Sequence, residues 1–206
     1  VHVVMVMNEA FSDLTDSPAF DYGEEDDPLS NLHALEADPH ALSGHLVVPG
    51  FAGGTANTEF DVLTGMQTNA LNPAATSASA FRCVNRNLDS VFRLFDDAGY
   101  HTTFLHPGDA WFYNRENVYQ WLGAQDILFA PDFQDSQSKG RWVTDETVAR
   151  NLIDRYEDSM AAGTPVMDYA VTIQNHMSYT ADKYGEGYVF PPVETNATLS
   201  EEASTL

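Results

Sequence analysis

The chain has 206 residues, and 31 acidic residues against 9 lysines and arginines give it a formal charge of −22. This balance excludes a basic nucleic-acid-binding surface, because nucleic acid is bound by clustered cations, so we expect no nucleic-acid partner. The hydrophobic fraction of 43% is enough to bury a core. No run approaches the roughly 18 apolar residues of a membrane span. The single cysteine, Cys83, excludes a disulfide framework.

Short β-branched runs alternate along the chain with stretches whose apolar residues recur at helical spacing. The short runs lack polar alternation, which is typical of strands buried on both faces. In chain order we predict the strand Val3–Met7, the strand His45–Val48, the helix Thr55–Leu63, the helix Asn87–Ala98, the strand Thr102–Leu105, the helix Asn114–Leu122, the helix Thr144–Ala162 and the strand Tyr169–Ile173. The alternation favours an α/β fold with a mostly parallel sheet flanked by helices on both faces.

Six of the acidic residues crowd between Asp16 and Asp27. We interpret this stretch as an exposed loop whose charge keeps the surface solvated. Its carboxylates would also attract cations, although they lack the spacing of an EF-hand calcium loop. The tail 191–206 is polar, and the chain starts on a strand and stops without a closing element, so we expect a piece of a longer protein.

A residue able to bind a ligand closely follows each predicted strand. Glu9, Thr55, His106 and His176 come after the four runs in turn. Because the carboxyl ends of parallel strands share the edge where ligands bind, we expect these four side chains along one rim of the sheet. Polar residues also end strands for purely structural reasons, and for each residue taken alone that interpretation stays open.

Thr55 has the clearest local chemistry. Gly53 and Gly54 allow a sharp turn and close ligand access before the predicted helix. A hydroxyl in the first turn of a helix lies beside unpaired N–H groups at the positive end of the dipole, where phosphate binds, although threonine is also a common N-cap. Glu9 could share a divalent cation with this hydroxyl. Such hard oxygen ligands suit Mg²⁺ or Mn²⁺, and an added histidine would favour Mn²⁺ or Zn²⁺.

Two further clusters contain residues suited to anion binding or proton transfer. The planar guanidinium of Arg115 matches a phosphate or carboxylate, with an ion pair to Asp109 or Glu116 as the structural alternative. His176 lies among amides and hydroxyls, where it could hold a substrate oxygen or donate a proton. A hydrogen-bonded structural histidine is the alternative for His176.

Four motifs occur in order along the chain: Val3–Leu14, Gly53–Phe60, Phe112–Arg115 and Val171–His176. Together they resemble the extracellular catalytic domain of phosphoglycerol transferases of the lipoteichoic acid synthase type. Those enzymes belong to the sulfatase family of the alkaline phosphatase superfamily. The resemblance runs from Val1 to about Tyr188 and implies an alkaline phosphatase/sulfatase-like fold.

The resemblance also implies roles for six residues. Glu9 is a metal ligand, and Thr55 is the metal-bound nucleophile that takes up a phosphoglycerol group. The substrate-binding residues are Arg115, His176, Tyr113 and Asp109, of which Asp109 departs by one residue from the family spacing. The implied cofactor is a divalent metal, Mn²⁺ or Mg²⁺, with Zn²⁺ as an alternative.

Two parts of the family pattern have no counterpart in residues 1–206. The family completes its metal site with an Asp-His pair, and no Asp-His dipeptide occurs here, so we expect that pair beyond Leu206. Membrane helices precede the family's catalytic domain and anchor it at the extracellular face of the bacterial cytoplasmic membrane. Residues 1–206 are therefore expected to be a partial catalytic domain, truncated at its C-terminus, with weak metal binding and little activity alone.

The implied reaction transfers phosphoglycerol from a phosphatidylglycerol-like lipid to a glycerol-phosphate polymer or glycolipid through a threonine-bound intermediate. A phosphodiesterase or phosphoethanolamine-type transferase would use the same threonine and metal chemistry. A true sulfatase is disfavoured, because the sequence Cys83-Val84-Asn85-Arg86 lacks the proline and the spacing of a formylglycine motif. A noncatalytic domain that binds anionic envelope polymer is the alternative of another class, and the presence of Thr55 and Glu9 argues against it.

Overall fold

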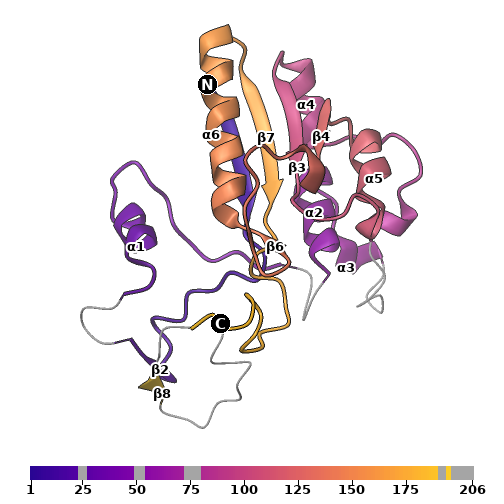
Figure 1. Ribbon diagram of the computed structural model, residues 1–206. Helices are drawn as coiled ribbons and strands as arrows, with labels where there is room; N and C mark the ends of the chain where they lie inside the picture. Colours follow the sequence, from indigo (N-terminus) through magenta and orange to yellow (C-terminus); the bar gives the residue numbers. More distant parts are fainter. Residues whose placement is uncertain (23–26, 49–53, 72–79, 190–193, 196–206) are drawn as a thin grey trace. The chain divides into compact units, whose positions relative to one another are not determined.

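The structure, a computed structural model, describes residues 1–22, 27–48, 54–71, 80–189 and 194–195 (Figure 1). The chain divides into two units. The first comprises Val1–Glu9 and Val48–Gln174, and the second comprises Ala10–Val47 and Asn175–Leu206. Of the six predicted site residues, only His176 belongs to the second unit. Gly53, three of the clustered acidic residues and most of the polar tail lie outside the described residues.

The first unit is built on a parallel sheet of four strands. These are β1 (Val3–Met7), β3 (His101–Leu105), β4 (Asp126–Leu128) and β7 (Val166–Val171), in the spatial order β1-β7-β3-β4. Tyr169 pairs in register with Met5 on one side and Phe104 on the other. Every residue of β7 is buried, as expected for a strand covered on both faces. The predicted mostly parallel α/β fold is therefore confirmed.

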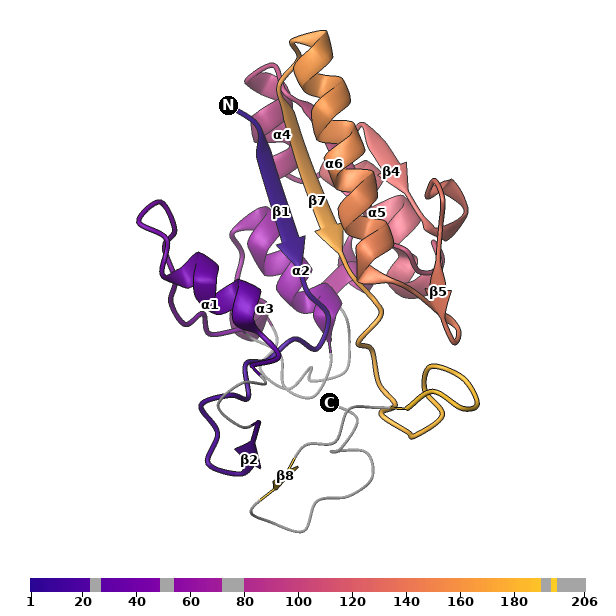
Figure 2. The same cartoon turned by 60° about the vertical axis from the view of Figure 1, so that its left-hand side comes forward.

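Helices cover both faces of this sheet (Figure 2). On one face lie α2 (Thr55–Thr64), α4 (Val91–Asp97) and α5 (Arg115–Leu122), and on the other lies α6 (Asp145–Ala162). Shorter elements join them: α3 (Thr68–Leu71), the 3₁₀ helices η1 (Ala80–Cys83), η2 (Phe112–Asn114) and η3 (Ala130–Asp132), and the antiparallel strands β5 (Ser138–Lys139) and β6 (Trp142–Val143).

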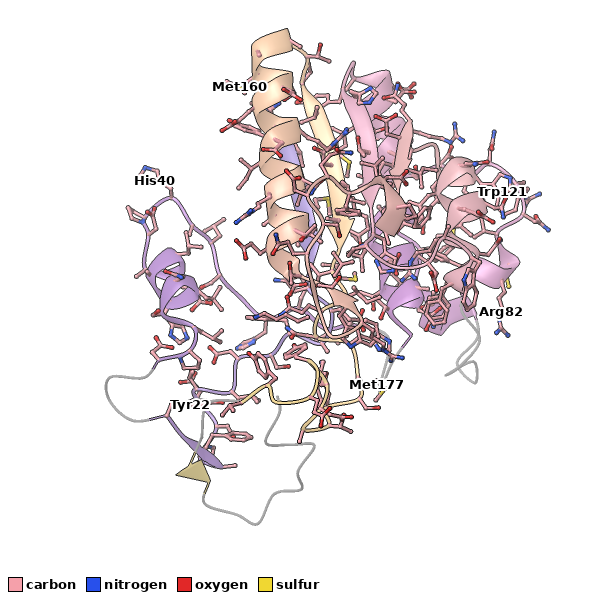
Figure 3. All side chains as sticks on the ribbon, in the orientation of Figure 1. Tyr22, His40, Arg82, Trp121, Met160 and Met177 are labelled. Carbon is pink, nitrogen blue, oxygen red and sulfur yellow. The ribbon has the colours of Figure 1, made fainter. Side chains whose placement is uncertain are left out.

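Alternate residues of the two central strands contribute to two separate cores. Phe104 and Tyr169 belong to the core with α2, α4 and α5, whereas Leu105 and Ala170 pack with Leu152 of α6. In the first core the Phe104 ring stacks on Tyr119 of α5, with 3.4 Å between centroids. Removing a buried aromatic ring costs about 3–5 kcal/mol, so this stacking fixes α5 against β3. Met160 extends outward from α6 (Figure 3) and is 54% exposed.

Local capping sets where three helices begin or end. The Thr144 hydroxyl accepts the Thr147 N–H at 3.2 Å and starts α6, as predicted. The Ser90 hydroxyl accepts the Arg93 N–H at 3.3 Å, so α4 begins at Val91 and the predicted start at Asn87 is wrong. Gly123 ends α5 in the left-handed conformation that glycine adopts without steric cost.

One predicted strand is wrong. Residues His45–Val48 form no strand in the structure, and Leu46 and Val47 are 84% and 94% exposed. A β-branched run becomes a strand where a neighbouring strand bonds its backbone and a core buries its side chains, and this run pairs with no strand among the described residues. The prediction that a strand at His45–Val48 leads into Thr55 is therefore wrong. The last predicted strand lies three residues earlier at its start, as Val166–Val171.

The second unit contains α1 (Ser30–Glu36) and the antiparallel pair of β2 (Phe20–Asp21) and β8 (Glu194–Thr195). His33 of α1 lies between two carboxylates, with Nε2 3.0 Å from Asp13 and Nδ1 2.7 Å from Asp27. These contacts tie both flanks of the acidic stretch to α1. Across the described parts of the chain, no helix is long and apolar enough to cross a membrane.

Candidate active site

The side chains of Thr55 and Glu9 meet in the first unit. Thr55 is the first residue of α2, and Glu9 follows the end of β1 by two residues. The Thr55 hydroxyl donates to Glu9 at 2.9 Å from Oε2 and 3.2 Å from Oε1. A hydroxyl and a carboxylate from separate elements thus converge on one point, as predicted, and their roles as nucleophile and metal ligand stay predictions.

The position of Glu9 is fixed by the neighbouring strand. Its backbone N–H donates to the Thr172 hydroxyl at 3.0 Å, and the Thr172 N–H donates to the Met7 carbonyl at 3.0 Å. Thr172 directly follows β7, which lies beside β1 in the sheet. The adjacent carboxyl ends of two parallel strands therefore hold the backbone of Glu9, which is the arrangement expected at a ligand-binding sheet edge.

The position of Thr55 is fixed by the turn into α2. Gly54 has φ of 89°, a left-handed conformation that strains any residue with a Cβ. Its carbonyl accepts the Asn57 N–H at 2.8 Å, and the Asn57 side chain in turn accepts the Ala80 N–H at 2.7 Å. Thr55 consequently stands in the first turn of the helix, where unpaired N–H groups and the helix dipole favour an anion.

The oxygens of Glu9 and Thr55 fit a hard divalent cation by their chemistry, because carboxylate and hydroxyl oxygens are the ligands that Mg²⁺ and Mn²⁺ prefer. Two protein ligands make only part of such a site. Among the residues that the structure describes, no group of three or more His, Cys, Asp or Glu side chains converges to hold a metal ion. The chemistry of these two side chains therefore suits part of a metal site, and their role as metal ligands stays a prediction.

Arg115, a predicted substrate-binding residue, is 2% exposed and paired with a residue that the sequence did not single out. Its Nη2 donates to Glu59 Oε1 at 2.5 Å and its Nε to Glu59 Oε2 at 3.2 Å. The Tyr119 hydroxyl also donates to Oε2, at 2.6 Å. The ion-pair partner is thus Glu59 rather than Asp109 or Glu116. The sequence feature that could have pointed to it is an acidic residue within α2 whose helix neighbours are buried.

The charges of this buried pair stabilise each other. Burial opposes the ionised form of Glu59, but the charge of Arg115 and the hydrogen bonds from Arg115 and Tyr119 outweigh it, so the pKa of Glu59 lies below its ordinary value. Burial likewise opposes the charge of Arg115, and the carboxylate raises its pKa. Burial and the nearby carboxylate raise the pKa of Tyr119 well above its ordinary value. Glu59 and Arg115 are therefore both ionised at neutral pH.

The backbone before α5 brings Tyr113 against Arg115. Tyr113 and Asn114 have φ of 58° and 59°, which costs non-glycine residues about 1 kcal/mol or more each. The Tyr113 ring centre lies 5.0 Å from the Arg115 guanidinium carbon, within range of a cation–π contact. Asp109 lies on the same connection, exposed, and its carbonyl accepts the Phe112 N–H at 3.1 Å. The substrate-binding roles of these residues stay predictions.

The two remaining histidines of the predicted rim lie in different units. His106 directly follows β3 and is 3% exposed, with Nδ1 2.9 Å from the Val171 carbonyl at the end of β7. Gly108 lets the ring lie close to the backbone, since a Cβ there would be 2.5 Å from His106 Nε2. His176 belongs to the second unit, where Nδ1 lies 2.8 Å from the Met177 carbonyl. Its substrate-binding role also stays a prediction.

The sequence resembles known proteins over nearly its whole length. The family model for sulfatases matches residues 1–204. The chain is 30% identical over 190 residues to a protein named putative cyclic beta-1,2-glucan modification protein from Rhizobium meliloti (strain 1021). That alignment covers 91% of this chain and 27% of the relative, so the chain spans about a quarter of the relative's length.

Solved structures share the fold. The lipoteichoic acid synthase LtaP from Listeria monocytogenes matches with a TM-score of 0.73 and 20% identity, over 86% of this chain and 41% of that one. The Streptococcus pyogenes phosphoglycerol transferase GacH, in complex with sn-glycerol-1-phosphate, matches with a TM-score of 0.73 and 23% identity, over 98% of this chain and 51% of that one. A Vibrio parahaemolyticus protein in the alkaline phosphatase superfamily matches with a TM-score of 0.67 and 18% identity, over 99% of this chain and 46% of that one.

Proposed function

The chain belongs to the sulfatase family, and we propose that it carries the nucleophile and part of the metal site of a phosphoglycerol transferase. The observation that carries this proposal is the contact between the Thr55 hydroxyl and the Glu9 carboxylate, at 2.9 and 3.2 Å. Solved neighbours named as a lipoteichoic acid synthase and a phosphoglycerol transferase support the choice of reaction.

In the proposed first step, the Thr55 oxygen attacks the phosphorus of a phosphatidylglycerol-like lipid. A bond forms between Thr55 Oγ1 and phosphorus, the bond to the diacylglycerol oxygen breaks, and diacylglycerol leaves with a proton. An acceptor hydroxyl then attacks the threonine-bound phosphoglycerol and restores the Thr55 hydroxyl.

Glu9 and Thr55 are the residues of this chain that would hold a divalent metal, Mn²⁺ or Mg²⁺, with Zn²⁺ as the alternative. Such an ion, when bound, lowers the proton affinity of a hydroxyl and offsets charge on phosphoryl oxygens. We propose that the remaining ligands come from an Asp-His pair beyond Leu206 of the natural protein. Residues 1–206 alone would then bind the metal weakly and turn over little substrate.

Arg115 and the start of α2 supply positive charge for the phosphoryl group. The guanidinium offers N–H donors in one plane, and the first-turn N–H groups of α2 surround Thr55. Donors that are already in place cost no reorganisation when charge develops. His176, Tyr113 and Asp109 are proposed to contact the substrate, with Tyr113 stacking beside Arg115.

The names of the relatives suggest the donor and acceptor classes. The neighbour with bound sn-glycerol-1-phosphate supports a phosphoglycerol group as the transferred unit. The relative named for modification of a cyclic β-1,2-glucan supports a glycan acceptor, and the lipoteichoic acid synthase supports a glycerol-phosphate polymer or glycolipid. We propose that the reaction takes place at the extracellular face of the bacterial cytoplasmic membrane, with the anchor in segments outside residues 1–206.

Two alternatives make different predictions. A phosphodiesterase or a phosphoethanolamine-type transferase would use the same Thr55 and Glu9 chemistry but prefer another donor head group, so donor assays separate them. A noncatalytic domain for anionic envelope polymer would bind polymer equally well after removal of the Thr55 hydroxyl. The close contact between the two side chains supports catalysis over simple binding, because polymer binding does not require a hydroxyl held against a carboxylate.

The test is the substitution Thr55→Ala in the natural full-length protein. Diacylglycerol release from phosphatidylglycerol vesicles is expected to fall by at least about 1,000-fold, because the attacking oxygen is gone. Thr64→Ala is the matched control, since Thr64 lies at the other end of α2 and its hydroxyl bonds the Phe60 carbonyl. Unchanged release from Thr55→Ala would remove the nucleophile assignment and the proposed function with it.

A further inference from the structure

Glu59 is a buried charge whose oxygens are both hydrogen-bonded. It has no exposed surface and accepts three hydrogen bonds: from Arg115 Nη2 at 2.5 Å, Arg115 Nε at 3.2 Å and the Tyr119 hydroxyl at 2.6 Å. The two nitrogens form one edge of the guanidinium plane, and two contacts to that edge fix its orientation as well as its position. Glu59 therefore holds Arg115 in one fixed orientation, and Tyr119 holds Glu59.

Helix geometry places this pair beside the candidate nucleophile. Thr55 and Glu59 both belong to α2 and are four residues apart. Side chains at this spacing lie on the same face of a helix, with about 5–6 Å between Cβ atoms. The residue that binds the guanidinium of Arg115 therefore lies on the same face of α2 as Thr55.

One nitrogen of Arg115 has no hydrogen-bond partner in the part of the chain that the structure describes. Nη1 is buried and bonded to nothing among the described residues, although Nε and Nη2 are both bonded to Glu59. An N–H group left without an acceptor away from water destabilises the fold, and more so when it is charged. Native proteins rarely leave such a group unbonded unless a ligand completes it. The charge and planar shape of this donor suit a phosphoryl oxygen.

We propose that Glu59 is a positioning residue: with Tyr119 it holds the Nε–Nη2 edge of Arg115, so that Nη1 is presented to a phosphoryl oxygen of the substrate at Thr55. This inference rests on the proposed function and adds a residue to its machinery. Tyr113, 5.0 Å from the guanidinium carbon, covers one face of the guanidinium plane. The remaining direction for a hydrogen bond in that plane is the one that Nη1 occupies.

The test is a double-mutant cycle in the natural full-length protein, with Glu59→Gln, Arg115→Lys and the double variant. Diacylglycerol release from phosphatidylglycerol vesicles gives kcat/KM. Each single change is expected to lower kcat/KM roughly 100-fold, because a small misplacement of a phosphate-binding group has an effect of that size. The double variant is expected to be no worse than Arg115→Lys alone, since Glu59 acts through Arg115. Losses that multiply, or full activity of Glu59→Gln, would overturn the inference.

Two further variants separate positioning from folding. Tyr119→Phe keeps the buried ring and removes one donor to Glu59, so a drop of roughly 10-fold in kcat/KM is expected with little loss of stability. Leu152→Ala, in the core on the α6 face, lowers stability and is expected to leave kcat/KM per folded molecule unchanged. An unchanged kcat/KM for Tyr119→Phe, or an equal drop for Leu152→Ala at temperatures where it is folded, would contradict a positioning role.

Binding of sn-glycerol-1-phosphate distinguishes failure of this inference from failure of the proposed function. Measured by calorimetry on the inactive Thr55→Ala protein, binding is expected to weaken by roughly 10- to 100-fold when Glu59→Gln is added. If Thr55→Ala abolishes release but added Glu59→Gln leaves binding intact, the role of Glu59 alone is refuted. If Thr55→Ala retains full release, the proposed function itself fails.

Discussion

Two buried ion pairs lie on opposite faces of the same sheet, and they differ in how many hydrogen-bond donors reach the acid. On the α2 and α5 face, Glu59 accepts three hydrogen bonds from Arg115 and Tyr119. On the α6 face, Asp168 of β7 faces Arg155 at 3.5 Å, and neither carboxylate oxygen has a hydrogen-bond partner among the described residues. Both acids have no exposed surface, so burial alone does not distinguish them.

The difference in donors reverses the direction of the pKa shift. Burial raises the pKa of Asp168, and the charge of Arg155 together with weaker interactions with Thr103 and Arg155 only partly offsets it. For Glu59 the charge of Arg115 and the hydrogen bonds from Arg115 and Tyr119 outweigh burial, and the pKa falls below its ordinary value. Arg155 also interacts with residues other than Asp168, since it donates to the Thr103 hydroxyl and lies 3.7 Å from Asp126. The pKa of a buried acid next to an arginine therefore falls below its ordinary value where donors are aimed at both oxygens, as in Glu59, and rises where they are not, as in Asp168.

The largest expected effect comes from breaking the pair of Arg115 and Glu59, in which both carboxylate oxygens are hydrogen-bonded. Arg115→Leu leaves Glu59 charged and buried with Tyr119 as its donor, and removal of one partner of a buried pair costs about 3–5 kcal/mol. The free energy of unfolding can be followed in urea by tryptophan fluorescence, because Trp111, Trp121 and Trp142 all belong to the first unit.

Arg150→Leu is the matched control for this substitution. Arg150 pairs with Glu146 one turn away on α6, with both side chains more than half exposed. Exposed pairs at this spacing contribute about 0.3–0.5 kcal/mol. A loss in Arg115→Leu no larger than that in Arg150→Leu would show that the buried pair does not stabilise the fold.

A smaller effect, of opposite sign, is expected on the other face. Asp168→Asn removes a charge that lacks donors, so it is expected to be neutral or to stabilise by up to about 2 kcal/mol at neutral pH. Glu59→Gln is the same change of acid to amide and is expected to destabilise. Destabilisation by both changes, measured by the same urea unfolding, would contradict the comparison.

The pH dependence of the Asp168→Asn effect has a definite direction. Because the pKa of Asp168 is raised in the folded state, the folded chain holds this proton more tightly than the unfolded chain. Ionisation of Asp168 therefore weakens folding as the pH rises above the ordinary carboxyl pKa. The gain in Asp168→Asn should be largest at neutral pH and disappear below the ordinary value of 3.8, where both states are protonated. A gain independent of pH would point to packing rather than charge.

The parts predicted correctly from sequence depend on short-range pattern. Val3–Met7 and the strand ending at Leu105 were found because an unbroken β-branched run predicts a strand. The expected burial on both faces is wrong for Val3–Met7, since Val4 and Val6 are 44% and 48% exposed. The approach of Thr55 to Glu9 was found because strand ends and a glycine turn converge on one sheet edge. His45–Val48 has the same local pattern as these strands and failed, because pairing depends on a partner that no local pattern reveals.

The residues that the sequence did not reveal depend on distant partners. An acidic residue such as Glu59 is usually exposed on a helix. Glu59 can be buried because it pairs with Arg115, 56 residues away, and Tyr119, 60 residues away. The strand β4 is only three residues long and starts with Asp126, whose charge masks the pattern. Single-sequence reasoning therefore finds residues with a chemical signature, whereas it misses those that position them.

The smallest expected effect concerns His33 in the second unit. It compares the two buried ion pairs with a histidine whose carboxylate partners are exposed to solvent. His33 holds Asp13 and Asp27, and the hydrogen bonds to Asp13 and then Asp27 raise its pKa to about 9. The stabilisation is therefore complete below the ordinary histidine value of 6.5 and is lost as the pH rises through about 9. An NMR titration of the imidazole measures this directly. Asp27→Asn should lower the pKa while Asp13 keeps it above 6.5, and high salt should lower it further, because exposed pairs are screened. If the imidazole of the unaltered chain titrates near 6.5, two exposed carboxylates are not enough to raise the pKa of a histidine. Burial would then be needed before the placement of hydrogen-bond partners can shift a pKa.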